Sequence, residues 1–456
     1  MSARNRELFG LFGVGLLVTA GFTAVFTADT VDTAKIGNTS LIYGGYFFGV
    51  CLAIHVVMRL RLPNADPYLF PLVALLAAFG LVLLFRIEDS LAFKQATLFL
   101  VSLGIFLAIV LVFRDYMVLE RYRYLIAVGG ILLLLSPRLL IDHAVVDRTG
   151  AYINADLGFT SFQPAELAKI CVVIFLASYL RDRREVLIVG ARRFLGLTLP
   201  PLKHLGPLLV VWGAAMLMLI FIRDLGSSLM LFGGFLAILY VATNRVSFVI
   251  IGMLLFLVGF AFLAQTVPHV QERVEIWQDP FAVDGPAGAQ QLQQSLFAQA
   301  NGGLFGEGLG QSLIELPRTF KVHCSGGLTF PDCNSILPAP HTDFIYAVAV
   351  DELGLFGGAA IICIYGLIGA RGFRTAVIAP DGFSKLLAVG LSAVFVLQAF
   401  VIIGGVTQVI PLTGVTLPFI SFGGSSVIAN MILVALLLMI SDRARSETWR
   451  GDEVRL

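Results

Sequence analysis

The chain has 456 residues, of which 58% are hydrophobic and only 13% are charged, and its formal net charge is +1. Soluble globular proteins carry about 25% charged residues, so the composition excludes a soluble enzyme and indicates a protein that crosses the membrane many times. The near-neutral net charge itself says nothing about nucleic acid, because the charges are segregated by loop. For a membrane protein of this kind we expect no nucleic-acid partner.

Apolar stretches that are long enough to cross a bilayer, roughly 16–25 residues each, recur along the chain. Helices are the expected spanning form, because backbone polar groups in lipid must be satisfied within the segment. We therefore predict an all-α polytopic membrane protein with about twelve transmembrane helices, near residues 8–28, 41–60, 68–86, 95–113, 124–141, 165–180, 207–222, 226–243, 246–266, 342–370, 384–406 and 421–440. The first stretch is followed at once by others, which argues against a cleavable signal peptide.

The distribution of lysine and arginine predicts the orientation, because these residues favour cytoplasmic loops. With the N-terminus inside, 21 of the 31 basic residues fall in inside loops and termini, 9 fall outside, and Lys169 lies within a span. We therefore expect a protein of the plasma membrane with both termini in the cytoplasm. The basic inside loop, residues 181–206, is predicted to lie on the anionic membrane surface.

Three of the five cysteines fall inside predicted spans, where a lone thiol packs as a small apolar residue: Cys51, Cys171 and Cys363. The other two, Cys324 and Cys333, fall in a long outside loop. An oxidising exterior favours a disulfide between them. A metal site is the alternative there, since His323 is adjacent.

The long loops lie on the predicted outside, at residues 142–164, 267–341 and 407–420. Irregular loops of such length are usually functional, so we expect the active face to be extracytoplasmic. Asp343 stands at the end of the second loop, just before an apolar run. A charge at the mouth of a membrane helix is costly unless it is solvated, paired or used. Helix capping by Thr342 or Asp343 is one interpretation, and a chemical role for Asp343 is the other.

A second polar group begins at Gln163 and is followed by Pro164, which suits the first turn of a helix. Glu166 and Lys169 are three residues apart and therefore share one helical face. They form either a structural ion pair that holds two helices together, or a site in which Lys169 faces an anionic ligand and Glu166 orients it.

Two further groups lie at the same membrane boundary. The sequence Arg223-Asp224-Leu225-Gly226-Ser227-Ser228 is typical of a tight turn in which Arg223 pairs with Asp224 or meets a ligand. The amide-rich stretch 293–301 and the glycines that follow it, up to Gly310, predict a short interfacial helix and a loop whose backbone approaches another group closely.

The last group runs from Gly404 to Ser426 and contains several Pro and Gly residues that break helices at membrane depth. Irregular backbone is tolerated there only against protein or a water-filled cavity. We expect this segment to form a re-entrant wall opposite Asp343, with Ser425 and Ser426 at its end.

Together these motifs resemble the SEDS family (shape, elongation, division and sporulation), the membrane glycosyltransferases typified by RodA, FtsW and SpoVE. The resemblance rests on five stretches in the family's order: 162–169, 224–228, 294–310, 341–357 with its Asp351-Glu352-Leu353-Gly354, and 414–426. The family core has ten helices, which implies a two-helix N-terminal addition (1–67), a core (68–440) that includes the long outside loop 267–341, and a cytoplasmic tail (441–456). The addition is most similar to actinobacterial RodA-type proteins.

Two departures from the family pattern concern recognition of the donor. Tyr152 stands where the family commonly has Trp, within an altered basic stretch that begins at Arg148, and the segment with Cys324 and Cys333 is an unusual insertion ahead of His341. Both leave the expected reaction class unchanged.

The resemblance implies a peptidoglycan glycosyltransferase that polymerises lipid II at the outer leaflet beside a class B penicillin-binding transpeptidase. It places the essential carboxylate on Asp343. We expect the substrate to be bound by residues of the motifs above: Gln163, Glu166, Lys169, Arg223, His341, Thr342, Ser425 and Ser426.

In the expected mechanism Asp343 is the general base for the acceptor hydroxyl. Cations stabilise the leaving diphosphate, first Lys169, then Arg223, with Arg86 and Lys94 as weaker candidates. A divalent cation, Mg²⁺ or Mn²⁺, could share that task, although the sequence indicates no protein metal site. The alternatives are a flippase for lipid II, for which no internal repeat is seen, and a scaffold that only recruits a transpeptidase.

Overall fold

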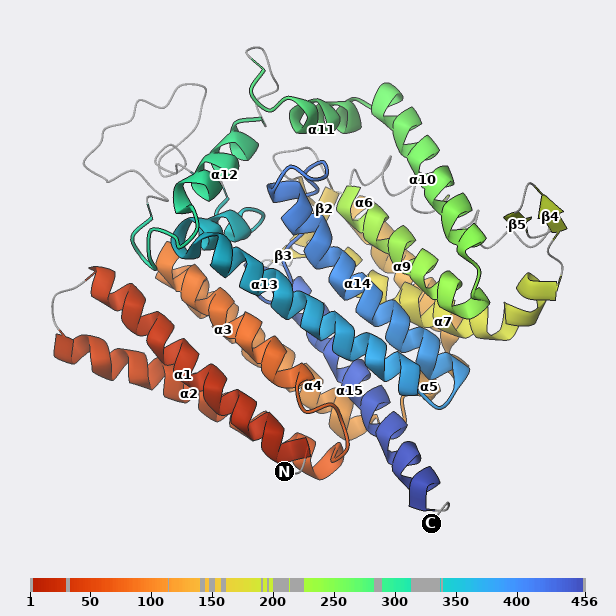
Figure 1. Cartoon of the computed structure of the whole chain (residues 1–456), viewed down its shortest axis with the longest axis horizontal. Coiled ribbons are helices and arrows are strands. Elements are labelled where there is room, and N and C mark those ends of the chain that lie inside the picture. The colour runs from red at the N-terminus through yellow and green to blue at the C-terminus, as the bar shows by residue number, and fades with distance from the viewer. Residues whose placement is uncertain are drawn as a thin grey trace.

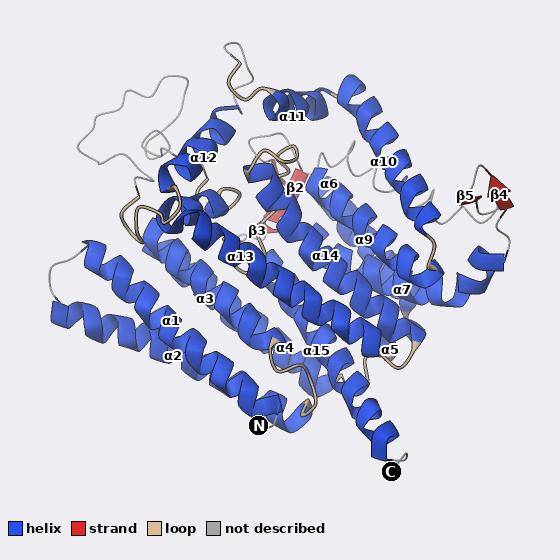
Figure 2. Ribbon diagram, viewed as in Figure 1, coloured by secondary structure: helices blue, strands red, loops and turns tan. Residues whose placement is uncertain are grey.

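The computed structural model describes residues 3–29, 33–113, 115–139, 144–146, 152–156, 161–189, 192–194, 197–199, 213, 225–282, 289–312, 337 and 339–453. These residues are almost entirely helical, and the strands are short (Figure 2). Both ends of the chain lie at the same end of the helix bundle (Figure 1). The opposite end, which carries α11 (Pro268–Gln278) and α12 (Ala289–Gly302), is called the distal end below.

Eleven of the twelve predicted spans coincide with helices of the structure: α1 (Ala3–Asp29), α2 (Thr33–Arg61), α3 (Leu69–Ile87), α4 (Asp89–Val112), α6 (Arg123–Leu139), α7 (Pro164–Val189), α9 (Leu225–Thr243), α10 (Val246–Thr266), α13 (Ile345–Ile378), α14 (Gly382–Val406) and α15 (Gly424–Glu453). The twelfth, 207–222, lies outside the described residues. Within the described part, nine helices are long and apolar enough to cross a membrane, and α6 and α7 are not among these nine. The polytopic all-helical class is therefore confirmed, while the number twelve stays a prediction.

The remaining elements are short connections. Helix α5 (Val118–Arg121) precedes α6, and the small sheet β1 (Ala144–Val146), β2 (Tyr152–Asp156) and β3 (Ser161–Phe162) precedes α7. A hairpin of β4 (Arg192–Phe194) and β5 (Leu197–Leu199) follows α7. No strand was expected from the sequence, because these segments are too short to show an alternating pattern.

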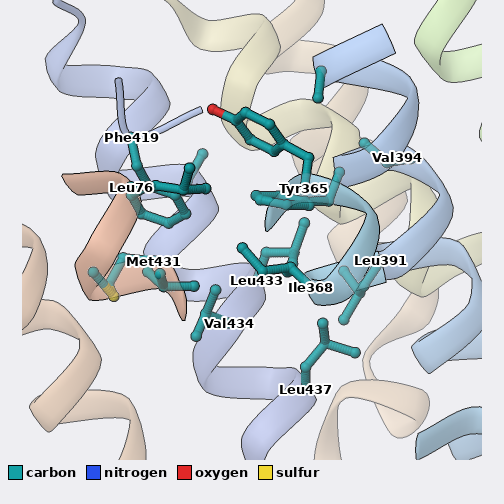
Figure 3. Close-up of a cluster of buried hydrophobic side chains, with 14 of the residues drawn as sticks. Leu76, Tyr365, Ile368, Leu391, Val394, Phe419, Met431, Leu433, Val434 and Leu437 are labelled. Carbon is teal, nitrogen blue, oxygen red and sulfur yellow. The ribbon is translucent and has the colours of Figure 1, made fainter. Parts of the chain in front are cut away.

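The core of the bundle is formed by α14 and α15, whose spanning windows are 78% and 89% buried, against 33% for α1 and for α2. Figure 3 shows how α3, α13, α14 and α15 contribute interlocking side chains, including Leu76, Tyr365, Leu391 and Leu433. Apolar burial gives little preference for protein over lipid, so close packing has to hold such helices together.

Two sets of buried charges hold the N-terminal helices and the C-terminal helix at the end that carries the termini. Glu7 of α1 pairs with Arg4 and with His55 of α2, and Arg4 also donates to the carbonyl of Ala65. Asp66, which is 1% exposed, pairs with both Arg371 of α13 and Arg445 of α15. Two helices that are distant in sequence, α13 and α15, are therefore tied to one carboxylate in the connection between α2 and α3.

Replacing Asp66 by alanine leaves two half-buried guanidinium groups without their shared carboxylate. We expect Asp66→Ala to lower the free energy of unfolding by about 3 kcal/mol or more, because breaking a buried ion pair strands its partner. Unfolding in detergent measures the change. The control is Asp182→Ala, which breaks an exposed pair with Arg123 and is expected to cost at most about 1 kcal/mol. Equal losses in the two variants would contradict the assignment.

Candidate active site

Asp343 lies in the turn that leads into α13 and is half-buried. The helix begins at Ile345 and Phe344 holds the N-cap position, so neither Thr342 nor Asp343 occupies the position at which the sequence placed a cap. One carboxylate oxygen of Asp343, Oδ2, lies 3.9 Å from the point that a Cβ on Gly414 would occupy. Nη2 of Arg273 lies 3.9 Å from the same point. A carboxylate and a guanidinium therefore border one space above Gly414.

The segment that contains Gly414, residues 407–423, is irregular and packs against the turn of Asp343. The backbone N–H of Phe422 donates to the carbonyl of His341 at 2.8 Å, and the Ser421 hydroxyl donates to the carbonyl of Thr342 at 2.7 Å. An irregular segment thus packs against the turn of Asp343, and we call residues 407–423 the wall segment. That it re-enters the membrane opposite Asp343 stays a prediction.

The wall segment is held from behind by α3, α4 and α13. A Cβ on Gly80 of α3 would lie 2.6 Å from the carbonyl oxygen of Phe419, so the two backbones are in direct contact. Gln95 of α4 donates to the carbonyl of Ser421 at 3.1 Å and accepts from the N–H of Gly423 at 3.2 Å. Tyr365 of α13 donates to the carbonyl of Pro418. Buried backbone groups that leave regular structure need such partners.

Helix α11 covers the wall segment from the distal side. Trp277 donates its indole N–H to the carbonyl of Gln408 at 3.0 Å, and the Gln408 amide donates back to the carbonyl of Trp277 at 2.9 Å. Arg273 donates through Nη1 to the carbonyl of Leu412 at 2.7 Å. The sequence identified Arg273 only as one of the outside charges, since its nearness to Asp343 depends on how a long loop folds back.

The pair of Glu166 and Lys169 lies inside the protein. The two side chains are 2% and 6% exposed, and their charged atoms are 2.6 Å apart. Lys169 also donates to the amide oxygen of Gln398 in α14, whose amide nitrogen donates to the carbonyl of Thr416 at 3.0 Å. This arrangement favours the structural interpretation: the pair joins α7 to α14 and to the wall segment.

Gln398 is central to this arrangement, yet the sequence analysis did not select it. The signal was present, because an amide in the middle of the apolar stretch 384–406 is itself costly in a membrane helix. Gln398 is fully buried.

The remaining predicted binding residues near α7 and α15 also contact protein groups. The backbone N–H of Gln163 donates to the Ser425 hydroxyl at 2.9 Å. The Ser426 hydroxyl accepts from the amide of Asn430 at 3.2 Å. The first contact fixes the start of α7 against the start of α15, and the second lies within α15.

His341 lies beside the wall segment, with its ring 6.1 Å from that of Phe422. Burial lowers the pKa of His341, and the negative charge of Glu88 opposes this shift. The imidazole is therefore mainly neutral near pH 7, so it can bind a substrate hydroxyl but adds little positive charge to the site.

The other side chains that were predicted to stabilise the leaving diphosphate are not shown beside Asp343. Arg86 pairs with the buried Glu352 at 3.3 Å and donates to the carbonyl of Ser312 at 2.9 Å. Lys94 is exposed on α4. Arg223, Cys324 and Cys333 lie outside the described residues.

The glycine-rich loop after α12 lies against a kink in α13. Gly354 interrupts that helix with φ of 68° and ψ of −172°. The backbone N–H groups of Glu307 and Gly308 donate to the carbonyls of Asp351 and Glu352, at 3.0 and 2.9 Å. The prediction that this loop approaches another group closely is confirmed, and the group is the backbone of α13.

Comparison with known proteins agrees with this architecture. The family described as "Cell cycle protein", whose name combines FtsW, RodA and SpoVE, matches residues 59–320 and 327–446. The chain therefore belongs to the FtsW/RodA/SpoVE family. The match begins near the end of α2, so α1 and most of α2 precede the part shared by this family.

Similar members of the family include two from mycobacteria. The chain is 39% identical over 452 residues to the peptidoglycan glycosyltransferase RodA of Mycobacterium tuberculosis, with 97% of this chain and 91% of the relative covered. It is 37% identical to the RodA of Mycobacterium leprae, over the same shares. It is 30% identical to the stage V sporulation protein E of Bacillus subtilis, covering 85% of this chain and all of the relative.

Solved structures share the fold. A chain from a study of how a peptidoglycan synthase complex coordinates polymerization and crosslinking aligns with a TM-score of 0.62 at 27% identity, covering 83% of this chain and 98% of that chain. The rod shape determining protein RodA of Thermus thermophilus aligns with a TM-score of 0.56 at 24% identity, covering 84% and 97%.

The structural interpretation of Lys169 makes a testable prediction. Lys169→Met strands the buried carboxylate of Glu166, so we expect the free energy of unfolding to fall by about 3 kcal/mol or more. The double variant Glu166→Gln with Lys169→Met removes both charges and should recover most of that loss. Unfolding in detergent measures both. Full stability of Lys169→Met together with weakened substrate binding would instead show that Lys169 faces the ligand.

Proposed function

We propose that the protein is a peptidoglycan glycosyltransferase that polymerises lipid II into glycan strands at the outer face of the plasma membrane. The family and the relatives named peptidoglycan glycosyltransferase, at 37–39% identity over 97% of the chain, support this class of activity. The observation that carries the mechanism is the position of Asp343: a half-buried carboxylate beside the wall segment, across Gly414 from a guanidinium.

The orientation is part of the proposal. The excess of basic residues in the loops assigned to the inside supports a cytoplasmic location of both termini. Asp343, Arg273 and the wall segment then lie towards the extracytoplasmic side, because the termini and α11 are at opposite ends of the bundle (Figure 1). The site is thereby accessible to lipid-linked sugars in the outer leaflet.

Asp343 acts as the general base in this mechanism. Its carboxylate takes the proton of the acceptor sugar's 4-hydroxyl as that oxygen bonds to the anomeric carbon of the donor. The bond between this carbon and the diphosphate oxygen breaks, and the lipid diphosphate leaves with the electron pair. Such a leaving group needs no strong general acid, but the negative charge that it develops needs a nearby cation.

Arg273 is the cation that we assign to this task. Lys169, the first expectation from the sequence, is buried and paired with Glu166, and Arg86 is paired with Glu352. Arg273 is fixed through one nitrogen to the wall segment, and its other terminal nitrogen borders the space beside Asp343. The guanidinium can donate two hydrogen bonds to phosphate oxygens in that space.

A divalent cation is compatible with the same arrangement. Among the described residues, no group of three His, Cys, Asp or Glu side chains is placed to hold a metal ion. A Mg²⁺ or Mn²⁺ ion would therefore take most of its ligands from the diphosphate and from water, and it would share the neutralisation of charge with Arg273.

We also propose that a class B penicillin-binding transpeptidase is the partner. The similar chain from the peptidoglycan synthase complex belongs to an assembly in which polymerization and crosslinking are coordinated. Glycan strands made at the outer face by this protein would be the substrate of such a crosslinking enzyme.

The purified protein, supplied with labelled lipid II, tests the proposed activity directly. Wild-type protein should form glycan polymer on a gel, and Asp343→Asn should reduce the rate by about 100-fold or more, because the amide cannot accept the proton. Asp343→Asn keeps the shape of the side chain, so its unfolding midpoint should be unchanged. Polymerisation by Asp343→Asn at the wild-type rate would rule out the base, and transfer of lipid II across vesicle membranes without polymerisation would support a flippase.

The role of Arg273 is tested with the same assay. We expect Arg273→Gln to slow polymerisation by about 10²–10³-fold, the loss typical of one donor to a developing oxyanion, and Arg273→Lys to retain part of the rate. Glu272→Gln is the control, because Glu272 is the exposed neighbour on α11. Equal rates in Arg273→Gln and Glu272→Gln would exclude Arg273 from the site.

A further inference from the structure

An apolar groove of about 290 Å³ opens between the N-terminal hairpin of α1 and α2 and the helices α3 and α4. Helix α1 packs along α3, whereas α2 stands off from most of α4. The groove occupies the space between α2 and α4. Residues of α1 and α2 form about half of its lining, and the rest belong to α3 and α4, within the part of the chain that the family match covers.

The lining of the groove is largely aromatic, and none of the described residues that line it is charged. The rings of Phe47 and Phe99 stack at 5.9 Å, and Phe85 contacts both Tyr43 and Phe93 edge to face, at 6.0 and 6.5 Å. Uncharged walls of packed aromatic rings suit a hydrocarbon chain.

The groove ends at the corner between α3 and α4, next to the candidate active site. Phe85 and Phe93 flank this corner, and Glu88 within it is close enough to His341 to influence the pKa of that residue. Gln95, two residues after Phe93 on α4, binds the wall segment at Ser421 and Gly423. The first turns of α4 thus line the groove with one face and support the wall segment with another.

We propose that the groove binds the polyprenyl chain of one of the two lipid-linked substrates, in the part of the chain near its phosphate. This inference rests on the proposed function. Continuity of the groove with the site through the α3–α4 corner favours the substrate's own chain over a phospholipid acyl chain, which would have no reason to end beside His341. The N-terminal hairpin therefore adds a binding surface for the lipid part of the substrate.

The kinetic test uses a substitution that fills the groove with a larger side chain. Ala96 lies on its floor in α4, so Ala96→Phe should exclude the chain. We expect the KM for a substrate on an undecaprenyl chain to rise about tenfold, while the KM for the same sugar on a geranyl chain, which is too short to reach far into the groove, stays nearly constant. The preference of the wild-type protein for the long chain should shrink accordingly.

Two further variants keep this test decisive if Ala96→Phe folds poorly. Phe93→Ala removes a wall of the groove at a side chain that is 54% exposed, so it should fold normally and also weaken the preference for the long chain. Ala261→Phe is the matched control, because Ala261 is exposed on α10, away from the groove. It should leave the preference unchanged.

Labelling supplies a readout that does not depend on activity. Photoreactive undecaprenyl phosphate should label peptides that contain residues 42–50 or 85–100, and undecaprenyl phosphate should compete while phosphatidylglycerol does not. Equal competition by phosphatidylglycerol, or labelling elsewhere only, would overturn the proposal.

Wild-type protein without polymerase activity would refute the proposed function. An active wild type whose preference for chain length is unaffected by both Ala96→Phe and Phe93→Ala would refute the groove alone.

Discussion

The backbone of the wall segment has to satisfy its polar groups without the regular hydrogen bonds of a helix, at a depth where lipid offers none. The rest of the site depends on this constraint. Gln398, Tyr365 and Gln95, from three different helices, each bind a carbonyl of the wall segment. Each of these side chains would be costly in a membrane if it had no such partner. Their burial inside the bundle and the irregular path of the wall segment therefore explain each other.

This framework brings together residues that are distant in sequence. The turn of Asp343 is fixed to the wall segment through Ser421 and Phe422, and α11 is fixed to it through Trp277 and Arg273. The base and the cation of the proposed mechanism do not belong to one rigid element. They meet because both are attached to the same stretch of irregular backbone, which is in turn attached to the pair of Glu166 and Lys169 through Gln398.

Most of the transmembrane helices could be predicted from the sequence, because their length and hydropathy identify them. The irregular path of the wall segment could also be predicted, since Pro and Gly in an apolar region indicate broken helices. Partners across the fold were harder to predict. The ion-pair partner of Arg86 is the carboxylate of Glu352, more than 250 residues away in the sequence. Arg273 borders the same space as Asp343 only because of the path of the loop after α10. The spacing within one helix predicted the pair of Glu166 and Lys169. It could not show that Lys169 also donates a hydrogen bond to Gln398 of α14.

Gly414 provides the most direct test of the claim that the wall segment brings the base and the cation together. Its φ of 72° is unfavourable for any residue with a Cβ, and the space beside it is the one that Asp343 and Arg273 border. The measurement is the rate of glycan polymerisation by Gly414→Ala, with Gly366→Ala as the control at a helical position where an added Cβ meets no neighbour within 4 Å. The account predicts at least a tenfold loss for Gly414→Ala with an unchanged helical content, and a wild-type rate for the control. A wild-type rate for Gly414→Ala would contradict it.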